Sequence, residues 1–257
     1  MKKQLLVLVG LFLMSASSFA IHGGRDAKAG ELPSTVGFAV QDSPGRFRTF
    51  CSGTLIDAQT VLTAAHCHGE AGAEEAYVVF SLDANRADAV VLPISKWIVH
   101  DQWNEESVDE MDPRNTHDIA LAKFSGVMPE THRAAEILME DAFVKRGTQI
   151  LVAGYGYKEE SMEPGPDGWP QMPTGAGVLR STRVRVLDAQ FSATEVLTNE
   201  VKSGTNSADS GGSAFIRRGP KYYLWGVTSR GLPGQDGVYT RISRYLDWIR
   251  LNIPSAK

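Results

Sequence analysis

Short apolar segments bounded by glycine, proline or polar residues recur along the chain, and few segments carry the hydrophobic period of a helix. The 25 glycines supply turns between such segments. A helix is expected only at 243–252, where Ser243 can cap the first turn and Leu246 and Ile249 belong to an apolar stripe. The strand candidates are 36–40, 47–55, 77–82, 90–100, 116–124, 149–153, 178–187, 215–216 and 222–227. The sequence therefore predicts an all-β protein with a C-terminal α-helix.

The first 20 residues have the organisation of a secretory signal peptide. Lys2 and Lys3 precede an apolar run at 5–14, and small residues follow as far as Ala20. The run is too short for a membrane-spanning helix, which needs about 20 apolar residues. We expect cleavage after Ala20, which would make Ile21 the first residue of a soluble protein that is secreted or periplasmic.

The charge balance argues against nucleic-acid and membrane partners. Without Lys2 and Lys3 the 26 basic residues fall to 24 against 30 acidic ones, a formal net charge of −6. Such a chain has no electrostatic attraction to phosphate backbones or anionic lipid. A chain of this length can bury one large or two modest hydrophobic cores.

Only two cysteines occur, Cys51 and Cys67. In an oxidising compartment they are expected to form one structural disulfide, which would stabilise the fold by roughly 3 kcal/mol. A metal site is a weak alternative, because His66 and His68 flank Cys67 too closely to share one tetrahedral ion with it. We expect no metal and no cofactor.

Three segments hold residue types that nucleophilic catalysis uses. Ser210 lies between Asp209 and two glycines, and a serine hydroxyl becomes a nucleophile when a base and backbone donors assist it. A polar surface turn would explain the same residues. His66 follows an apolar run and could be a packed core residue, and Asp118 could merely cap the strand that follows it.

The order of these segments adds information. Together they resemble the chymotrypsin-like (trypsin-fold) serine proteases over essentially the whole mature chain, and the protein is identified as a secreted bacterial member. The motifs are Ile21-His-Gly-Gly, Cys51-Ser-Gly-Thr-Leu-Ile, Thr63-Ala-Ala-His66-Cys67, Asp118-Ile-Ala-Leu, Gly154-Tyr-Gly, Asp209-Ser210-Gly-Gly and Gly237-Val-Tyr-Thr-Arg-Ile.

The resemblance implies two packed six-stranded antiparallel β-barrels, at 21–125 and 126–257, with the active site between them. In such enzymes Ser210 would attack the peptide carbonyl, His66 would transfer the proton and Asp118 would orient the histidine. The expected activity is that of a secreted, monomeric serine endopeptidase. Its partners would be protein or peptide substrates and possible protein inhibitors.

The resemblance also implies a latch and an oxyanion hole. The free amino group of Ile21 would pair with Asp209, so that signal cleavage alone would activate the enzyme. The backbone N–H groups of Ala208 and Ser210 would bind the oxyanion, although the family usually has glycine at the first position. If that position requires a positive φ, alanine adds strain of roughly 1–2 kcal/mol, and a flipped peptide would remove one donor.

The implied specificity pocket departs from that of trypsin-like members, which carry an aspartate at the base. Its residues here are Gly204 and Thr205 at the base, and Ser229, Arg230, Gly231 and Gly237 in the walls. With glycines at 204, 231 and 237, the pocket is expected to accept a neutral residue before the cut. Arg230 is interpreted as a solvated side chain, or alternatively as one that favours acidic substrates.

A second function class stays open, namely a weak or inert homologue that binds proteins through the same cleft. The complete set of His66, Asp118 and Ser210 favours the enzyme, whereas Ala208 and Arg230 favour the binder. An α/β-hydrolase esterase does not fit, because its Gly-x-Ser-x-Gly elbow is missing and the residue order differs.

Overall fold

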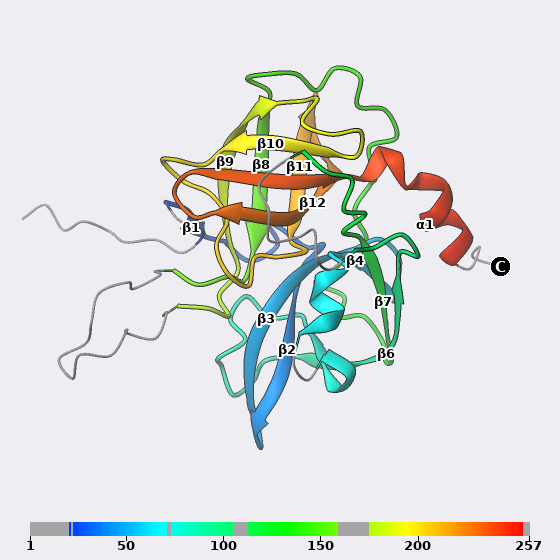
Figure 1. Ribbon diagram of the computed structural model, residues 1–257. Coiled ribbons are helices and arrows are strands. Elements are labelled where there is room, and N and C mark those ends of the chain that lie inside the picture. The colour runs from blue at the N-terminus through cyan, green and yellow to red at the C-terminus, as the bar shows by residue number, and fades with distance from the viewer. Residues whose placement is uncertain (1–20, 22, 71–72, 105–112, 159–174, 254–257) are drawn as a thin grey trace, which may run out of the picture.

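The computed structural model describes residues 21, 23–70, 73–104, 113–158 and 175–253 (Figure 1). The predicted signal peptide and its cleavage site lie outside these residues. None of the helices in the described ranges is long and apolar enough to cross a membrane.

The first half of the chain forms a closed six-stranded barrel, shown in blue to green in Figure 1. Its strands, in sheet order, are β2 (Thr35–Ser43), β3 (Arg46–Leu55), β4 (Thr60–Thr63), β7 (Ala120–Phe124), β6 (Val91–Val99) and β5 (Tyr77–Val79). Phe38, Leu62 and Leu121 are fully buried inside it. Two short 3₁₀ helices, η1 (His66–Gly69) and η2 (Ala73–Glu75), follow β4.

The second half, together with the short N-terminal strand β1, forms a seven-stranded antiparallel sheet. Its strands, in sheet order, are β1 (Arg25–Asp26), β9 (Arg180–Asp188), β10 (Glu195–Asn199), β13 (Asp236–Arg241), β12 (Lys221–Leu232), β11 (Ser213–Arg218) and β8 (Gln149–Gly154). β8 also pairs with β9, so the first and the last of the six longer strands in this order are hydrogen-bonded to each other. Ile150, Trp225 and Tyr239 are fully buried in this half.

Hydroxyl groups join the two halves where β2, β3 and β11 meet. Ser213 Oγ lies 2.8 Å from Thr35 Oγ1 and 2.6 Å from Thr54 Oγ1, and all three residues are buried. One hydrophobic cluster also continues across the boundary, from Phe38 to Leu224. The prediction of an all-β trypsin-type fold with a C-terminal helix is confirmed.

The helix begins later than its sequence predicted. α1 spans Leu246–Asn252 and follows the 3₁₀ turn η4 (Ile242–Arg244). The predicted N-cap at Ser243 is wrong, because that hydroxyl lies inside η4 and donates to Asp141 Oδ2 at 2.8 Å. The predicted apolar side of the helix agrees with the structure at Ile249, which is buried in the shared hydrophobic cluster.

Candidate active site

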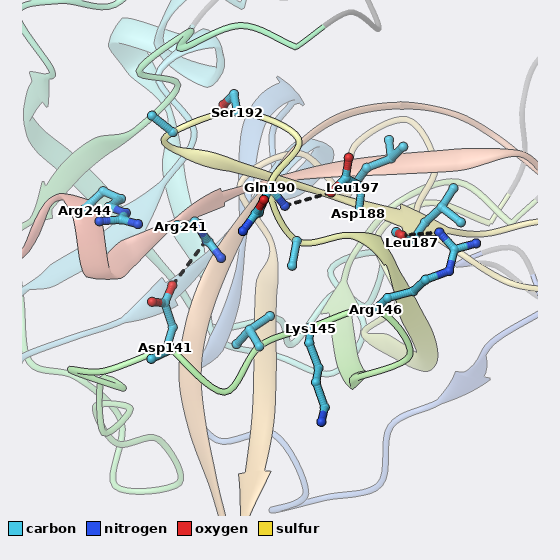
Figure 2. A pocket seen from close by; sticks show the side chains of 14 residues that line it. Asp141, Lys145, Arg146, Leu187, Asp188, Gln190, Ser192, Leu197, Arg241 and Arg244 are labelled. Atoms are coloured by element: carbon cyan, nitrogen blue, oxygen red, sulfur yellow. Dashed lines mark hydrogen bonds and ion pairs between the residues drawn. The ribbon is translucent and has the colours of Figure 1, made fainter.

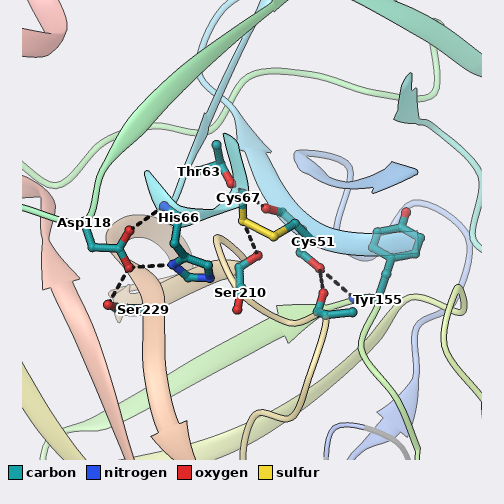
Figure 3. The surroundings of a disulfide bond; sticks show 10 residues. Cys51, Thr63, His66, Cys67, Asp118, Tyr155, Ser210 and Ser229 are labelled. Atoms are coloured by element: carbon teal, nitrogen blue, oxygen red, sulfur yellow. Dashed lines mark hydrogen bonds and ion pairs between the residues drawn. A yellow bond between two sulfur atoms is a disulfide. The ribbon is translucent and has the colours of Figure 1, made fainter. Parts of the chain in front are cut away.

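His66 and Asp118 meet because they leave neighbouring strands at the same end. β4 pairs with β7 so that Thr63 lies opposite Ala120, and the two functional residues lie just beyond this pair. Asp118 Oδ2 lies 2.9 Å from His66 Nδ1, and Asp118 Oδ1 accepts the backbone N–H of His66 at 3.0 Å (Figure 3). Both carboxylate oxygens therefore fix the histidine, one through its ring and one through its backbone.

Asp118 is fully buried and is held by a further hydroxyl. Ser229, on β12 of the other half, donates to Asp118 Oδ2 at 2.6 Å. Burial alone would raise the pKa of Asp118, but the charge of His66 and the hydrogen bonds from His66 and Ser229 outweigh it and lower the pKa. The carboxylate therefore stays ionised at neutral pH.

Ser210 reaches the same place from the second half. Its backbone carbonyl accepts the N–H of Ser52 at 2.8 Å and lies 3.6 Å from Cys67 Sγ, next to His66 (Figure 3). The Ser210 hydroxyl forms no hydrogen bond with another described residue. Such bonds often tighten only when a substrate binds. The structure thus brings the three predicted residues to one site from both halves of the fold.

The predicted disulfide is present, between Cys51 of β3 and Cys67 of η1, with Cα atoms 6.1 Å apart. The sulfurs and a ring nitrogen of His66 lie within 4.8 Å of one another. Because both sulfurs are bonded to each other, neither can act as a thiolate ligand to a metal. The bridge instead holds the segment that carries His66 against the barrel.

Ala208 has a left-handed backbone, with φ of +68°. The peptide before it is held by its carbonyl, since Ser207 O accepts the N–H of Tyr157 at 2.9 Å. In a trans peptide the N–H points opposite to the carbonyl, so the Ala208 N–H is turned away from Tyr157. Neither that N–H nor the N–H of Ser210 is hydrogen-bonded within the described ranges, so both are available as donors.

Asp209 is fully buried beside two glycines. Its carboxylate accepts the N–H groups of Gly156 at 2.8 Å and Asn206 at 3.0 Å. Burial raises its pKa to about 7 despite these bonds. Ile21 is also fully buried, and its nitrogen is a peptide nitrogen in this chain because residue 20 precedes it.

Arg230 forms a buried ion pair that the sequence did not predict. Its guanidinium donates to both carboxylate oxygens of Glu195 on β10, at 2.8 and 2.9 Å, and the two side chains are only 6% and 1% exposed. The interpretation of Arg230 as solvated is wrong. The alternative, that its charge attracts acidic substrates, loses support because Glu195 neutralises it.

This ion pair is connected to Asp118 through a hydroxyl group. Glu195 Oε1 accepts the hydroxyl of Thr116 at 2.6 Å, and the Thr116 hydroxyl oxygen accepts the backbone N–H of Asp118 at 3.3 Å. Arg230 therefore helps to hold the segment before β7 in place.

Three of the other predicted pocket residues, Gly204, Thr205 and Gly237, contact an unexpected carboxylate, that of Glu200. Gly231 pairs with Gly237 between β12 and β13, and a Cβ built on Gly204 or on Gly237 would collide with the side chain of Glu200. Thr205 donates to the same carboxylate. Glu200 was not among the predicted site residues, because an acidic residue after a strand usually faces solvent.

Two further residues could not be singled out from the sequence. Ser52 lies inside a quoted motif, yet only the structure shows its hydroxyl donating to the Ala208 carbonyl at 2.9 Å and accepting from the N–H of Tyr155 at 2.9 Å. His117 was expected to lie on an extended strand. Its φ is instead +53°, and its ring stacks on His100 with ring centres 5.1 Å apart.

A separate hollow lies on the second half, away from the triad (Figure 2). Its charged lining includes the ion pair of Arg241 and Asp141, with Nε 3.3 Å from Oδ2. The labelled residues are Asp141, Lys145, Arg146, Leu187, Asp188, Gln190, Ser192, Leu197, Arg241 and Arg244. None of the predicted site residues lines it, so it does not contribute to the proposed chemistry.

Comparison with known proteins agrees with this geometry. Residues 21–249 match the family model described as Trypsin. The chain belongs to the trypsin family. Transmembrane protease serine 7 from Homo sapiens is 28% identical over 94% of this trypsin-family chain and 29% of its own length. The Mus musculus protein of the same name is 29% identical over 94% of the chain and 30% of its own length. The chain thus spans less than a third of these curated relatives.

The buried ion pair gives a stability prediction for this trypsin-family chain. Glu195→Gln should lower the free energy of unfolding by about 3–5 kcal/mol, because it removes the buried negative charge that accepts two hydrogen bonds from the Arg230 guanidinium. Asp88→Asn removes the carboxylate of an exposed pair with Arg86, with side chains 72% and 64% exposed, and should leave stability unchanged within error. Urea unfolding measures the stability of both variants. Equal losses of unfolding free energy would contradict the assignment of Glu195 and Arg230 as a stabilising buried ion pair.

Proposed function

We propose that the chain is a secreted serine endopeptidase that a bacterial cell exports as a monomer and that uses Ser210, His66 and Asp118. The observation that carries the proposal is the fixed His66, whose ring and backbone are both held by the buried, ionised Asp118. The relatives are named as transmembrane proteases. From the names of these relatives we carry over only the activity of a protease, because the match covers a small part of their length.

The proposed mechanism follows from these contacts. Ser210 Oγ attacks the carbonyl carbon of the scissile peptide while His66 Nε2 takes its proton. The C–N bond then breaks and Nε2 returns the proton to the leaving amine. Water attacks the acyl-enzyme in the same way and releases Ser210. Asp118 accepts the Nδ1–H throughout and stabilises the imidazolium.

The Ala208 and Ser210 N–H groups are proposed to bind the oxyanion of each tetrahedral intermediate. The positive φ of Ala208 supports an arrangement in which its N–H points into the oxyanion hole while the alanine backbone is strained. This strain favours a competing state in which the peptide relaxes and the donor is lost.

Ala208→Gly is therefore expected to raise kcat by up to about tenfold, since relief of roughly 1–2 kcal/mol of strain increases the population of the formed oxyanion hole. Steady-state kinetics on one peptide substrate measures the effect, with KM as an internal comparison. Unchanged or lower turnover would contradict the role of Ala208.

Maturation is proposed to occur by signal cleavage after Ala20. The ammonium group of Ile21 would then pair with Asp209, whose burial and raised pKa support the need for a cation beside it. Secreted material that begins at another residue would contradict this step.

The proposed activity is tested by incubating the processed protein with an unfolded protein substrate and identifying the fragments by mass spectrometry. We expect cleavage by the wild type and none by Ser210→Ala. Equal digestion by both proteins would indicate a contaminating protease.

The second candidate is a homologue with little or no activity that binds proteins at the same site. The strained Ala208 is the observation that favours it. The two functions differ in the reactivity of Ser210, because a binder does not need an activated nucleophile.

A further inference from the structure

The side chain of Ser52, on β3, connects the first barrel to the backbone around Ser210. The residue is fully buried, and its hydroxyl accepts the N–H of Tyr155 at 2.9 Å and donates to the Ala208 carbonyl at 2.9 Å. A backbone N–H can only donate and a carbonyl can only accept, so the two contacts fix the direction of the hydroxyl proton. The N–H of Ser52 also donates to the Ser210 carbonyl at 2.8 Å. Ser52 therefore contacts the chain on both sides of Asp209.

The two peptide groups that flank the Ala208 Cα atom are both hydrogen-bonded. The Ser207 carbonyl, in the peptide before that atom, accepts the N–H of Tyr157 at 2.9 Å. The Ala208 carbonyl, in the peptide after it, accepts the Ser52 hydroxyl. Because each peptide group is a rigid plane, fixing both planes fixes the φ and ψ angles of Ala208. The resulting φ is +68°, a value at which alanine is strained.

Of these two contacts, only the one from Ser52 depends on the type of side chain. The N–H of Tyr157 belongs to the backbone, and any residue except proline would supply it. The bond to the Ala208 carbonyl requires a hydroxyl on the side chain at position 52. Position 208 is also sensitive to residue type, because glycine adopts a positive φ without strain. The effects of substitutions at 52 and 208 should therefore depend on each other.

The strain of Ala208 and the hydrogen bond from Ser52 are of similar size. Relative to glycine, a left-handed alanine lowers the population of this backbone conformation by roughly tenfold. One buried hydrogen bond raises that population by up to about tenfold. The bond from Ser52 is thus large enough to offset the strain.

We propose that Ser52 is a positioning residue of the candidate protease, whose hydroxyl holds Ala208 in its left-handed conformation and so keeps the Ala208 N–H available to the oxyanion. This inference rests on the proposed function of Ser210 and of the oxyanion hole. It assigns the two residues as a pair, in which the hydroxyl at 52 allows alanine to occupy a position that suits glycine.

The kinetic test measures Ser52→Ala in two backgrounds. In the wild-type background we expect kcat to fall by about five- to tenfold, with KM unchanged within about twofold, because the oxyanion forms only after the substrate has bound. In the Ala208→Gly background the same substitution should lower kcat by less than about threefold, because glycine keeps the conformation without the bond. Equal fold losses of kcat in the two backgrounds would overturn the proposal.

Thr35→Val is the matched control for the loss of a buried hydroxyl. Thr35 is fully buried, and its hydroxyl lies 2.8 Å from Ser213 Oγ, so it joins the same two halves of the fold without contacting Ala208. We expect Thr35→Val to destabilise the protein in urea unfolding and to keep the wild-type kcat. A fall in kcat equal to that of Ser52→Ala would show that any lost hydroxyl between the halves has this effect, and would overturn the proposal.

Crystal structures of the processed wild type and of Ser52→Ala test the same point without any activity. Ala208 should keep its positive φ in the wild type and should be found predominantly at a negative φ in Ser52→Ala, with the Ser207–Ala208 peptide turned. A positive φ in both proteins would overturn the proposal.

Labelling of Ser210 by a fluorophosphonate separates this proposal from the proposed function. A labelled wild type whose loss of kcat in Ser52→Ala is independent of residue 208 would overturn only the role of Ser52. An unlabelled wild type in which Ser52→Ala turns Ala208 to a negative φ would support the contact between Ser52 and Ala208 and contradict the proposed enzyme.

Discussion

Asp118→Asn is expected to lower kcat by about 10⁴-fold while the protein stays folded. The backbone N–H of His66 donates to Oδ1, so the asparagine oxygen should take that position and its NH₂ should face Nδ1. The imidazole then carries its proton on Nε2 and cannot accept one from Ser210. The protein loses its base although the ring stays in place.

Ser229→Ala is the matched comparison for this prediction. It removes the hydroxyl that donates to Asp118 Oδ2 at 2.6 Å and leaves the carboxylate and the tautomer of His66 intact. We expect a loss of about tenfold in kcat, the effect of one hydrogen bond to a charged group. Stopped assays on one peptide substrate measure both variants. The assignment of Asp118 fails if Asp118→Asn keeps a tenth of the wild-type activity.

One extra residue before Ile21 is expected to lower kcat/KM by about 10²–10⁴-fold. The added residue moves the ammonium group away from Asp209, which is fully buried and cannot be reached by a longer, solvated end. Asp209 lies between Ala208 and Ser210, whose N–H groups are the proposed oxyanion hole, so the ordering of that hole should depend on the pair. The measurement compares the processed protein with a variant that carries one additional alanine.

The stability of the variant with the additional alanine should depend on pH in a defined direction. Without the ammonium group the pKa of Asp209 is raised to about 7, so the folded protein holds a proton that the unfolded chain releases near pH 4. Stability should therefore fall as pH rises from about 4 to about 7, by about 4 kcal/mol. Asp209→Asn should remove this fall in the extended protein. Denaturant unfolding across that range measures it, and a flat profile would contradict the pKa of Asp209.

The order of the motifs around His66, Asp118 and Ser210 was enough to identify a family resemblance, and that resemblance implied the fold and the meeting of the three residues. The alternation of apolar residues likewise located most strands. β10 was missed, since Glu195 suggests a solvent-exposed segment and its burial depends on Arg230. Such partners are far apart in the sequence, and pattern alone does not pair them.

The surroundings of the predicted pocket residues were not predicted either. The motif comparison assigned Gly204 and Gly237 to a pocket with free space, whereas a Cβ built on either glycine would collide with the side chain of Glu200. The N-cap at Ser243 failed because Asp141, about 100 residues earlier, competes for its hydroxyl. In each case a contact between distant segments overrode a local preference.

The central claim is that Ser210 is an activated nucleophile. Treating the processed protein with a fluorophosphonate and locating the adduct by peptide mass spectrometry tests it most directly. We predict one adduct, on Ser210, that forms far more slowly in Asp118→Asn and not at all in Ser210→Ala. A folded wild-type protein that begins at Ile21 and takes up no label would contradict the account and support the binding homologue.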